Sequence, residues 1–113
     1  LALLRRSSTP QNEEELIVID DLEISPSTMT VKRANTVIEL TQKEYQLLLL
    51  LARAKGRTLS KQSISEQIWD AHFDTNLNTI EVYINFLRKK IDRNYETKLI
   101  HTRPGFGYYL KDE

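Results

Sequence analysis

Cysteine is absent from the 113-residue chain, which excludes disulfide bridges and thiolate metal sites. Long apolar runs are absent too. The longest, residues 47–52, is far short of the roughly 20 residues that a membrane-spanning helix needs. The opening LALLRR is too short for the apolar core of a signal peptide and lacks a cleavage pattern. These absences favour a protein of the reducing cytoplasm with no membrane partner.

Catalytic motifs are missing as well. The two histidines, His72 and His101, lie in different predicted elements, and no nucleophile motif, phosphate-binding loop or metal-ligand cluster surrounds them. We expect His101 to be an ordinary residue of a strand. The sequence therefore predicts no enzyme activity, no cofactor and no metal site.

The formal net charge is zero, but the charges are separated along the chain. Residues 13–23 contain six acids and no base, whereas residues 83–103 contain six bases and two acids. Opposed blocks of this kind predict a polarised surface, whose positive part can attract a polyanion in spite of the neutral total.

The N-terminal part of the chain changes character at residue 16. Residues 1–6 have the pattern of the last turns of a helix, and residues 7–15 are polar with one proline, which is typical of a linker. A domain is expected over residues 16–113. Its first part has four short β-favouring runs separated by turn residues, which predicts an antiparallel sheet with strands at 16–19, 22–25, 29–33 and 36–40. Ala34-Asn35 predicts a tight hairpin turn.

From Thr41 the apolar period becomes helical. Thr41 and Glu44 form a capping box, and Gly56 is a natural stop, so a helix is expected over residues 41–56. Its leucines go almost all the way round, which predicts burial at the centre of the domain. Ser60 can cap a second helix over residues 61–69.

A third helix is expected over residues 78–92, and its two faces are both partly apolar. At 100° per residue, four apolar residues fall within one narrow stripe, which is the predicted core-facing side: Ile80, Ile84, Leu87 and Ile91. Val82 and Phe86 project from the opposite side together with Lys89. Apolar and cationic side chains on an outer face need a further explanation.

A hairpin is expected over residues 99–110. Pro104 fixes φ at the second turn position and Gly105 permits the positive φ of the third, which predicts a type II turn. The whole order predicts an α+β winged helix-turn-helix: an N-terminal antiparallel four-stranded sheet, three helices and a C-terminal β-hairpin wing.

Three blocks of the chain carry a family resemblance. IELTQKEYQLLLLLARAKGRTLSKQSISEQIWD, NTIEVYINFLRKKID and KLIHTRPGFGYYL resemble, in sequence and in spacing, the DNA-binding effector domain of OmpR/PhoB-type response regulators. The resemblance covers residues 16–110. It implies that residues 1–15 are the end of a receiver helix and an interdomain linker, and that the domain regulates transcription.

The resemblance also implies a DNA interface with the third helix in the major groove and the wing at the minor groove. Asn85 suits an adenine edge, Lys89 a guanine or a phosphate, and Val82 and Phe86 thymine methyls; Arg88 is better placed for a phosphate. The recognition-helix candidates are Thr79, Val82, Tyr83, Asn85, Phe86, Arg88 and Lys89. The wing candidates are Thr102 and Arg103, and the backbone candidates are Lys61 and Trp69.

Two positions depart from the family pattern. Phe86 stands where the family often has an arginine, so readout there should favour thymine or be weak. The wing has TRPG where relatives commonly have TVRG, so the cation moves to Arg103 and Pro104 takes the usual arginine position.

Four of the candidate contact residues also have a purely structural interpretation. Phe86 can pack against the wing or a neighbouring subunit, Arg103 and Lys61 can be solvated charges, and Trp69 can anchor the core.

The resemblance implies further partners for the full-length protein. These are promoter DNA with direct repeats, a sensor histidine kinase acting on the receiver, and a second copy of the protein; the isolated domain is expected to be a monomer. The connection after the second helix resembles the loop that often contacts RNA polymerase, with His72, Phe73 and Asp74 exposed, although it can equally be an ordinary connection. A winged helix that binds protein and not DNA is the alternative function.

Overall fold

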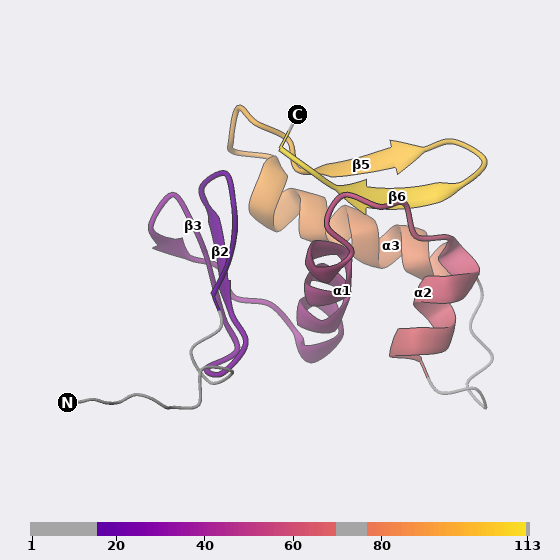
Figure 1. The fold of residues 1–113 in the computed structure, drawn as a ribbon, viewed down its shortest axis with the longest axis horizontal. Coiled ribbons are helices and arrows are strands. Elements are labelled where there is room, and N and C mark those ends of the chain that lie inside the picture. Colours follow the sequence, from indigo (N-terminus) through magenta and orange to yellow (C-terminus); the bar gives the residue numbers. More distant parts are fainter. Residues whose placement is uncertain (1–15, 70–76, 113) are drawn as a thin grey trace. The chain divides into compact units, whose positions relative to one another are not determined.

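The computed structural model describes residues 16–69 and 77–112, with the side chains of residues 77 and 78 left aside. The chain divides into two compact units on either side of the Glu39–Leu40 bond. In chain order (Figure 1) the elements are β1 (Ile17–Ile19), β2 (Leu22–Ser25), β3 (Thr30–Arg33), β4 (Thr36–Val37), α1 (Gln42–Arg53), α2 (Lys61–Ile68), α3 (Leu77–Leu87), the π-helical turn η2 (Arg88–Asp92), β5 (Ile100–Arg103) and β6 (Gly107–Leu110).

The first unit is the predicted antiparallel sheet, with strand order β1-β2-β3-β4. The tight turn at Ala34-Asn35 is confirmed: both residues have positive φ, 52° and 66°, as a two-residue type I′ hairpin requires. The prediction of a fourth strand over residues 36–40 was too long. Pairing in β4 ends at Val37, and beyond it the Ile38 N–H donates to the Val31 carbonyl at 2.8 Å.

Helix α1 begins as predicted and ends earlier. The Thr41 N–H donates to Glu44 Oε1 at 2.9 Å and the Glu44 N–H donates to Thr41 Oγ1 at 3.3 Å, which completes the capping box. The helix ends at Arg53, because Lys55 already adopts a positive φ of 55° before Gly56 does. The prediction of burial all round was also too broad. Three of its leucines are fully buried, but Leu49 and Leu50 are only partly covered.

Helix α2 is capped by Ser60, whose hydroxyl accepts the Ser63 N–H at 3.0 Å. It ends at Ile68, one residue before the predicted end, because Trp69 has an extended backbone. The predicted third helix was wrong in its last turn. From Arg88 the chain is π-helical, with the Arg93 N–H donating to the Arg88 carbonyl at 2.8 Å.

The predicted hairpin is present as β5 and β6, joined by the predicted turn. The Phe106 N–H donates to the Arg103 carbonyl at 2.9 Å and Gly105 has φ +82°, which are the features of a type II turn. Strand β6 also pairs with Leu59, whose N–H and carbonyl both bond to Tyr108. Figure 1 shows the hairpin lying along α3. Within residues 16–69 and 77–112, no helix has the length and apolarity that a membrane span requires.

Candidate nucleic-acid interface

The two predicted faces of the third helix are confirmed over α3 and η2. The core-facing stripe is at most 1% exposed, and it consists of Ile80, Ile84, Leu87 and Ile91. On the other side Val82 is 45% exposed and Phe86 39% exposed, and Asn85 and Lys89 are exposed beside them. The helix is thus held by one face and open along the other, while Thr79 lies half-buried near its start.

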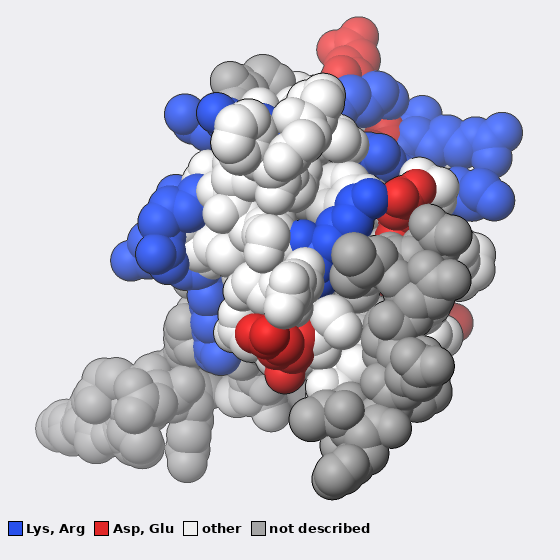
Figure 2. Space-filling model, turned by 90° about the vertical axis from the view of Figure 1, so that its right-hand side faces the viewer, with Lys and Arg blue, Asp and Glu red and all other residues white. Residues whose placement is uncertain are grey.

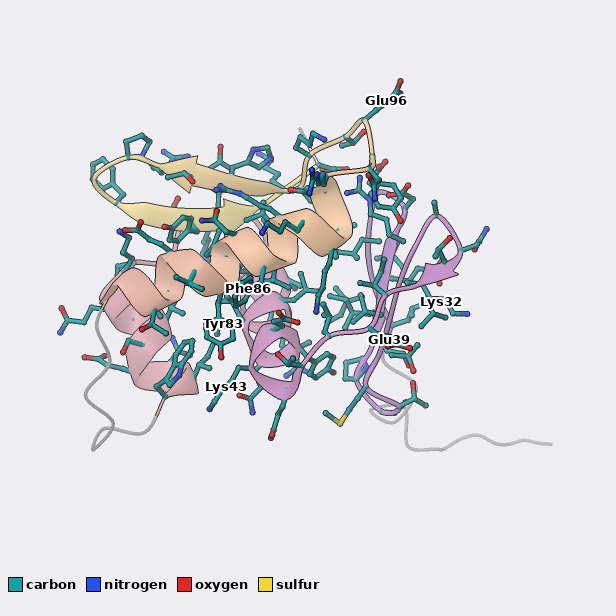
Figure 3. The ribbon with its side chains drawn as sticks, turned by 180° about the vertical axis from the view of Figure 1, so that it is seen from behind. Lys32, Glu39, Lys43, Tyr83, Phe86 and Glu96 are labelled. Carbon is teal, nitrogen blue, oxygen red and sulfur yellow. The ribbon has the colours of Figure 1, made fainter. Side chains whose placement is uncertain are left out.

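An aromatic row borders one flank of this open face. Trp69 is 7% exposed, and its ring meets the Tyr83 ring edge-on at a centroid distance of 5.3 Å. Tyr83 in turn meets Phe86 at 5.6 Å, and Figure 3 shows both side chains on the same side of α3. The Lys43 ammonium lies 5.6 Å from the centre of the Trp69 ring. Trp69 therefore anchors α2 and α3 to each other, and Phe86 packs on its own helix while part of its ring stays exposed.

Arg88 connects the other flank of α3 to the wing. Its Nη2 donates to Thr102 Oγ1 at 2.6 Å, and its Nε donates to the Ile100 carbonyl at 3.4 Å. Thr102 and Arg103 are exposed at the end of β5, and the Arg103 guanidinium lies 5.1 Å from the centre of the Tyr109 ring. The helix and the wing are therefore joined by hydrogen bonds at the residues expected to approach DNA.

Asp92 fixes the base of the wing, a role that the sequence analysis missed. Asp92 is only 4% exposed. It accepts the Leu99 N–H on one oxygen and the Ile100 N–H on the other, each at 3.0 Å. A continuous α-helix would place Asp92 about 100° away from Ile91 and off the core stripe, so helical periodicity gave no signal. The π-helical turn brings it inside.

Lys90 ties η2 to the start of α1. Its ammonium donates to Glu44 Oε1 at 2.6 Å, the same oxygen that accepts the Thr41 N–H. Burial alone would raise the pKa of Glu44, but the hydrogen bonds from Lys90 and Thr41 outweigh it and lower the pKa below its ordinary value. The carboxylate is therefore ionised at neutral pH and fixes η2 to the start of α1.

A cleft of about 610 Å³ opens between the start of α2, α3 and the wing. The charged side chains among its described lining are three cations and one acid: Lys61, Arg88, Arg103 and Glu81. Lys61 Nζ donates to Glu81 Oε2, and this hydrogen bond raises the pKa of the Lys61 ammonium. Burial raises the pKa of the nearby Tyr108 phenol, which stays neutral. Figure 2 shows Lys and Arg side chains in several groups on this side of the molecule, with fewer Asp and Glu.

His72, Phe73 and Asp74, the expected polymerase contacts, lie outside the described residues. Among residues 16–69 and 77–112 no group of His, Cys, Asp and Glu side chains is arranged to hold a metal ion.

The sequence and the fold both match known proteins. A family model described as "Transcriptional regulatory protein, C terminal" matches residues 35–110. The transcriptional activator protein IrlR of Burkholderia pseudomallei (strain 1026b) is 40% identical over 110 residues, which cover 97% of this chain and 47% of IrlR. The chain spans about half the length of the curated relatives it matches.

Solved structures agree with this match. The response regulator DrrB, described as a Thermotoga maritima OmpR/PhoB homolog, has a TM-score of 0.76 and 28% identity over 85% of this chain and 44% of DrrB. The DNA-binding domain of CpxR from E. coli has a TM-score of 0.72 and 27% identity over 88% of this chain and 99% of that domain. The predicted resemblance is confirmed, and the chain belongs to the family of transcriptional regulatory protein C-terminal domains, the DNA-binding effector domains of OmpR/PhoB-type response regulators.

Proposed function

We propose that this domain binds specific double-stranded promoter DNA and regulates transcription as the output domain of a two-component response regulator. Residues 78–92 enter the major groove and the wing, residues 99–110, lies at the minor groove. The observation that carries the proposal is the open face of α3, where Val82 and Phe86 are exposed on the side opposite the buried stripe. A helix that enters the major groove needs one face for the protein and another for base edges.

Each side chain on this face suits a particular contact. Asn85 and Lys89 are exposed polar donors that suit adenine and guanine edges, while Val82 and Phe86 suit thymine methyl groups. Thr79 and Tyr83 occupy the remaining contact positions of the helix. Because Phe86 donates no hydrogen bond, its contribution is restricted to apolar contact.

The backbone contacts come from the two flanks. Arg88, Thr102 and Arg103 border the wing side of the helix and are assigned to phosphates, sugars and the minor groove. Lys61 stands at the N-terminus of α2, where backbone N–H groups and a cation together favour a phosphate. Trp69 is assigned to the backbone as well, in addition to its packing role.

The full-length protein has further partners under this proposal. A phosphoacceptor receiver precedes the domain, with residues 1–6 as the end of its last helix and residues 7–15 as the linker. A sensor histidine kinase phosphorylates the receiver in the cytoplasm, and the protein dimerises on direct repeats about one helical turn apart. The isolated domain is a monomer, and the loop carrying His72, Phe73 and Asp74 contacts RNA polymerase. The domain itself catalyses no reaction and uses no cofactor.

A salt titration of binding separates this function from a winged helix that binds only protein. The chain should select a duplex from random DNA, and its affinity should fall steeply with salt, with a slope of about −0.9 per neutralised phosphate on logarithmic axes. Lys89→Ala should weaken binding, whereas Lys32→Ala, which removes an exposed cation from β3, should change it little. A flat salt response would favour the protein-binding alternative.

A further inference from the structure

The cleft beside α3 contains cations whose internal partners differ in charge. Arg88 is hydrogen-bonded to the Thr102 hydroxyl, and Arg103 lies over the Tyr109 ring. Both partners are neutral, so both guanidinium groups keep their full attraction for an anion.

Lys61 is the exception among the described cations of the cleft. Its partner is the Glu81 carboxylate, which accepts a hydrogen bond from the Lys61 ammonium. The two charges cancel at short range, and Glu81 is the one acid among the described lining residues. The side of the cleft formed by α2 and α3 is therefore close to neutral, while the wing side is positive.

The Lys61–Glu81 pair is accessible to a competing anion. The Lys61 side chain is 34% exposed and the Glu81 side chain 46% exposed, so water reaches both groups. Ion pairs in such positions are weak, because solvent screens them and both side chains lose freedom in forming them. A phosphate oxygen has the same sign of charge as the carboxylate and can replace it as the partner of the ammonium group.

We propose that Glu81 limits the affinity of this cleft for the DNA backbone. Its carboxylate is the internal counter-ion of the Lys61 ammonium until a phosphate takes the place of the carboxylate. The inference rests on the proposed DNA-binding function. Glu81 contributes no attraction to DNA. It sets how much of the positive charge at the N-terminus of α2 is available when the duplex arrives, and in this way it reduces sequence-independent binding.

The test compares Glu81→Gln with the unmodified chain in a fluorescence-anisotropy salt titration, using a labelled duplex selected from random DNA. Glutamine keeps the size of the side chain and removes its charge. We expect the Kd to fall by about 1.5- to 5-fold, the range set by releasing one exposed ion pair. The salt slope should steepen by up to about 0.9, because Glu81 retains Lys61 in part of the complexes of the unmodified chain, whereas in Glu81→Gln the ammonium is always available to a phosphate.

Two further comparisons make the test specific. Glu66→Gln makes the same charge change on the exposed side of α2, outside the cleft, and should change affinity less and leave the slope unaltered. In a Lys61→Ala background, adding Glu81→Gln should no longer steepen the slope, because no ammonium is there to be released. Thermal unfolding of each variant checks that the domain remains folded.

The outcomes separate this inference from the proposed function. If the unmodified chain binds DNA with a steep salt slope but Glu81→Gln binds equally or more weakly, then Glu81 does not restrain Lys61 and only the inference is wrong. An equal gain from Glu66→Gln would assign the effect to net charge and would also overturn it. If the unmodified chain shows no salt-dependent DNA binding, both proposals fail.

Discussion

Replacing Asp92 by alanine tests how the wing is attached to η2 at the end of α3. The carboxylate is the acceptor for two buried backbone N–H groups, those of Leu99 and Ile100. Alanine leaves both donors without this acceptor, at about 1–3 kcal/mol for each buried unpaired group. The expected loss is therefore about 2–6 kcal/mol of unfolding free energy, a large fraction of the roughly 5–15 kcal/mol that stabilises a typical domain. Asp92→Asn keeps one acceptor oxygen and should lose about half as much.

Urea denaturation followed by the fluorescence of Trp69, the one tryptophan of the chain, measures this loss. Native-state hydrogen exchange should in addition show faster exchange at the Leu99 and Ile100 amides. Asp112→Ala is the matched control, since it removes an equal charge from an exposed position and should change stability by less than about 0.5 kcal/mol. The account of the wing is refuted if Asp92→Ala unfolds like the control and both amides keep their protection.

Three further changes have expected outcomes that differ in kind. Gly107→Ala should lower the free energy of unfolding by about 1–3 kcal/mol, the range typical of backbone strain. The reason is that a Cβ at this position, where φ is +150°, would lie 2.0 Å from the Leu59 carbonyl oxygen. Gly105→Ala, whose Cβ would have no atom within 4 Å, should cost less in the same thermal melts. Glu44→Gln should reduce the loss of unfolding free energy that occurs as the pH is lowered. The folded-state pKa of Glu44 is lowered, so its carboxylate stabilises the domain fully above the unfolded-state pKa of about 4.3. This stabilisation is lost as the pH falls through the folded-state pKa. Phe86→Ala should leave the domain folded and relax base preference at one or two base pairs by roughly 1–3 kcal/mol in site selection, whereas unfolding with unchanged preference would mean that the ring only packs.

Helical periodicity was enough to predict the two faces of α3. Ile80, Ile84 and Leu87 recur at the spacing of one face, and apolar side chains at that spacing are buried because the core is the only apolar surface that they can share. Local turn chemistry was equally reliable. The Pro104-Gly105 turn uses φ values that these two residues favour. In the Ala34-Asn35 turn, Asn35 tolerates the positive φ well, whereas Ala34 adopts its φ of 52° against its own preference.

The features that the sequence did not predict depend on contacts between different elements of the fold. The π-helical turn that buries Asp92 is stabilised by backbone groups of Leu99 and Ile100, which no periodicity of residues 78–92 can indicate. The pairing of Leu59 with β6 and the Lys61–Glu81 ion pair likewise join segments that are separate in sequence. The buried and exposed positions of α3 were therefore predictable from its own periodicity, but the internal hydrogen-bond partners of its side chains were not.

The most direct test of the central claim is an NMR titration of the uniformly ¹⁵N-labelled chain with a duplex that it has selected from random DNA. The open face of α3 and the wing should form the binding surface, so the largest amide shifts should occur over residues 79–89 and 101–107. Residues of the first sheet should change little. Large shifts confined to residues 16–39, with α3 and the wing unaffected, would contradict the assignment of α3 as the recognition helix.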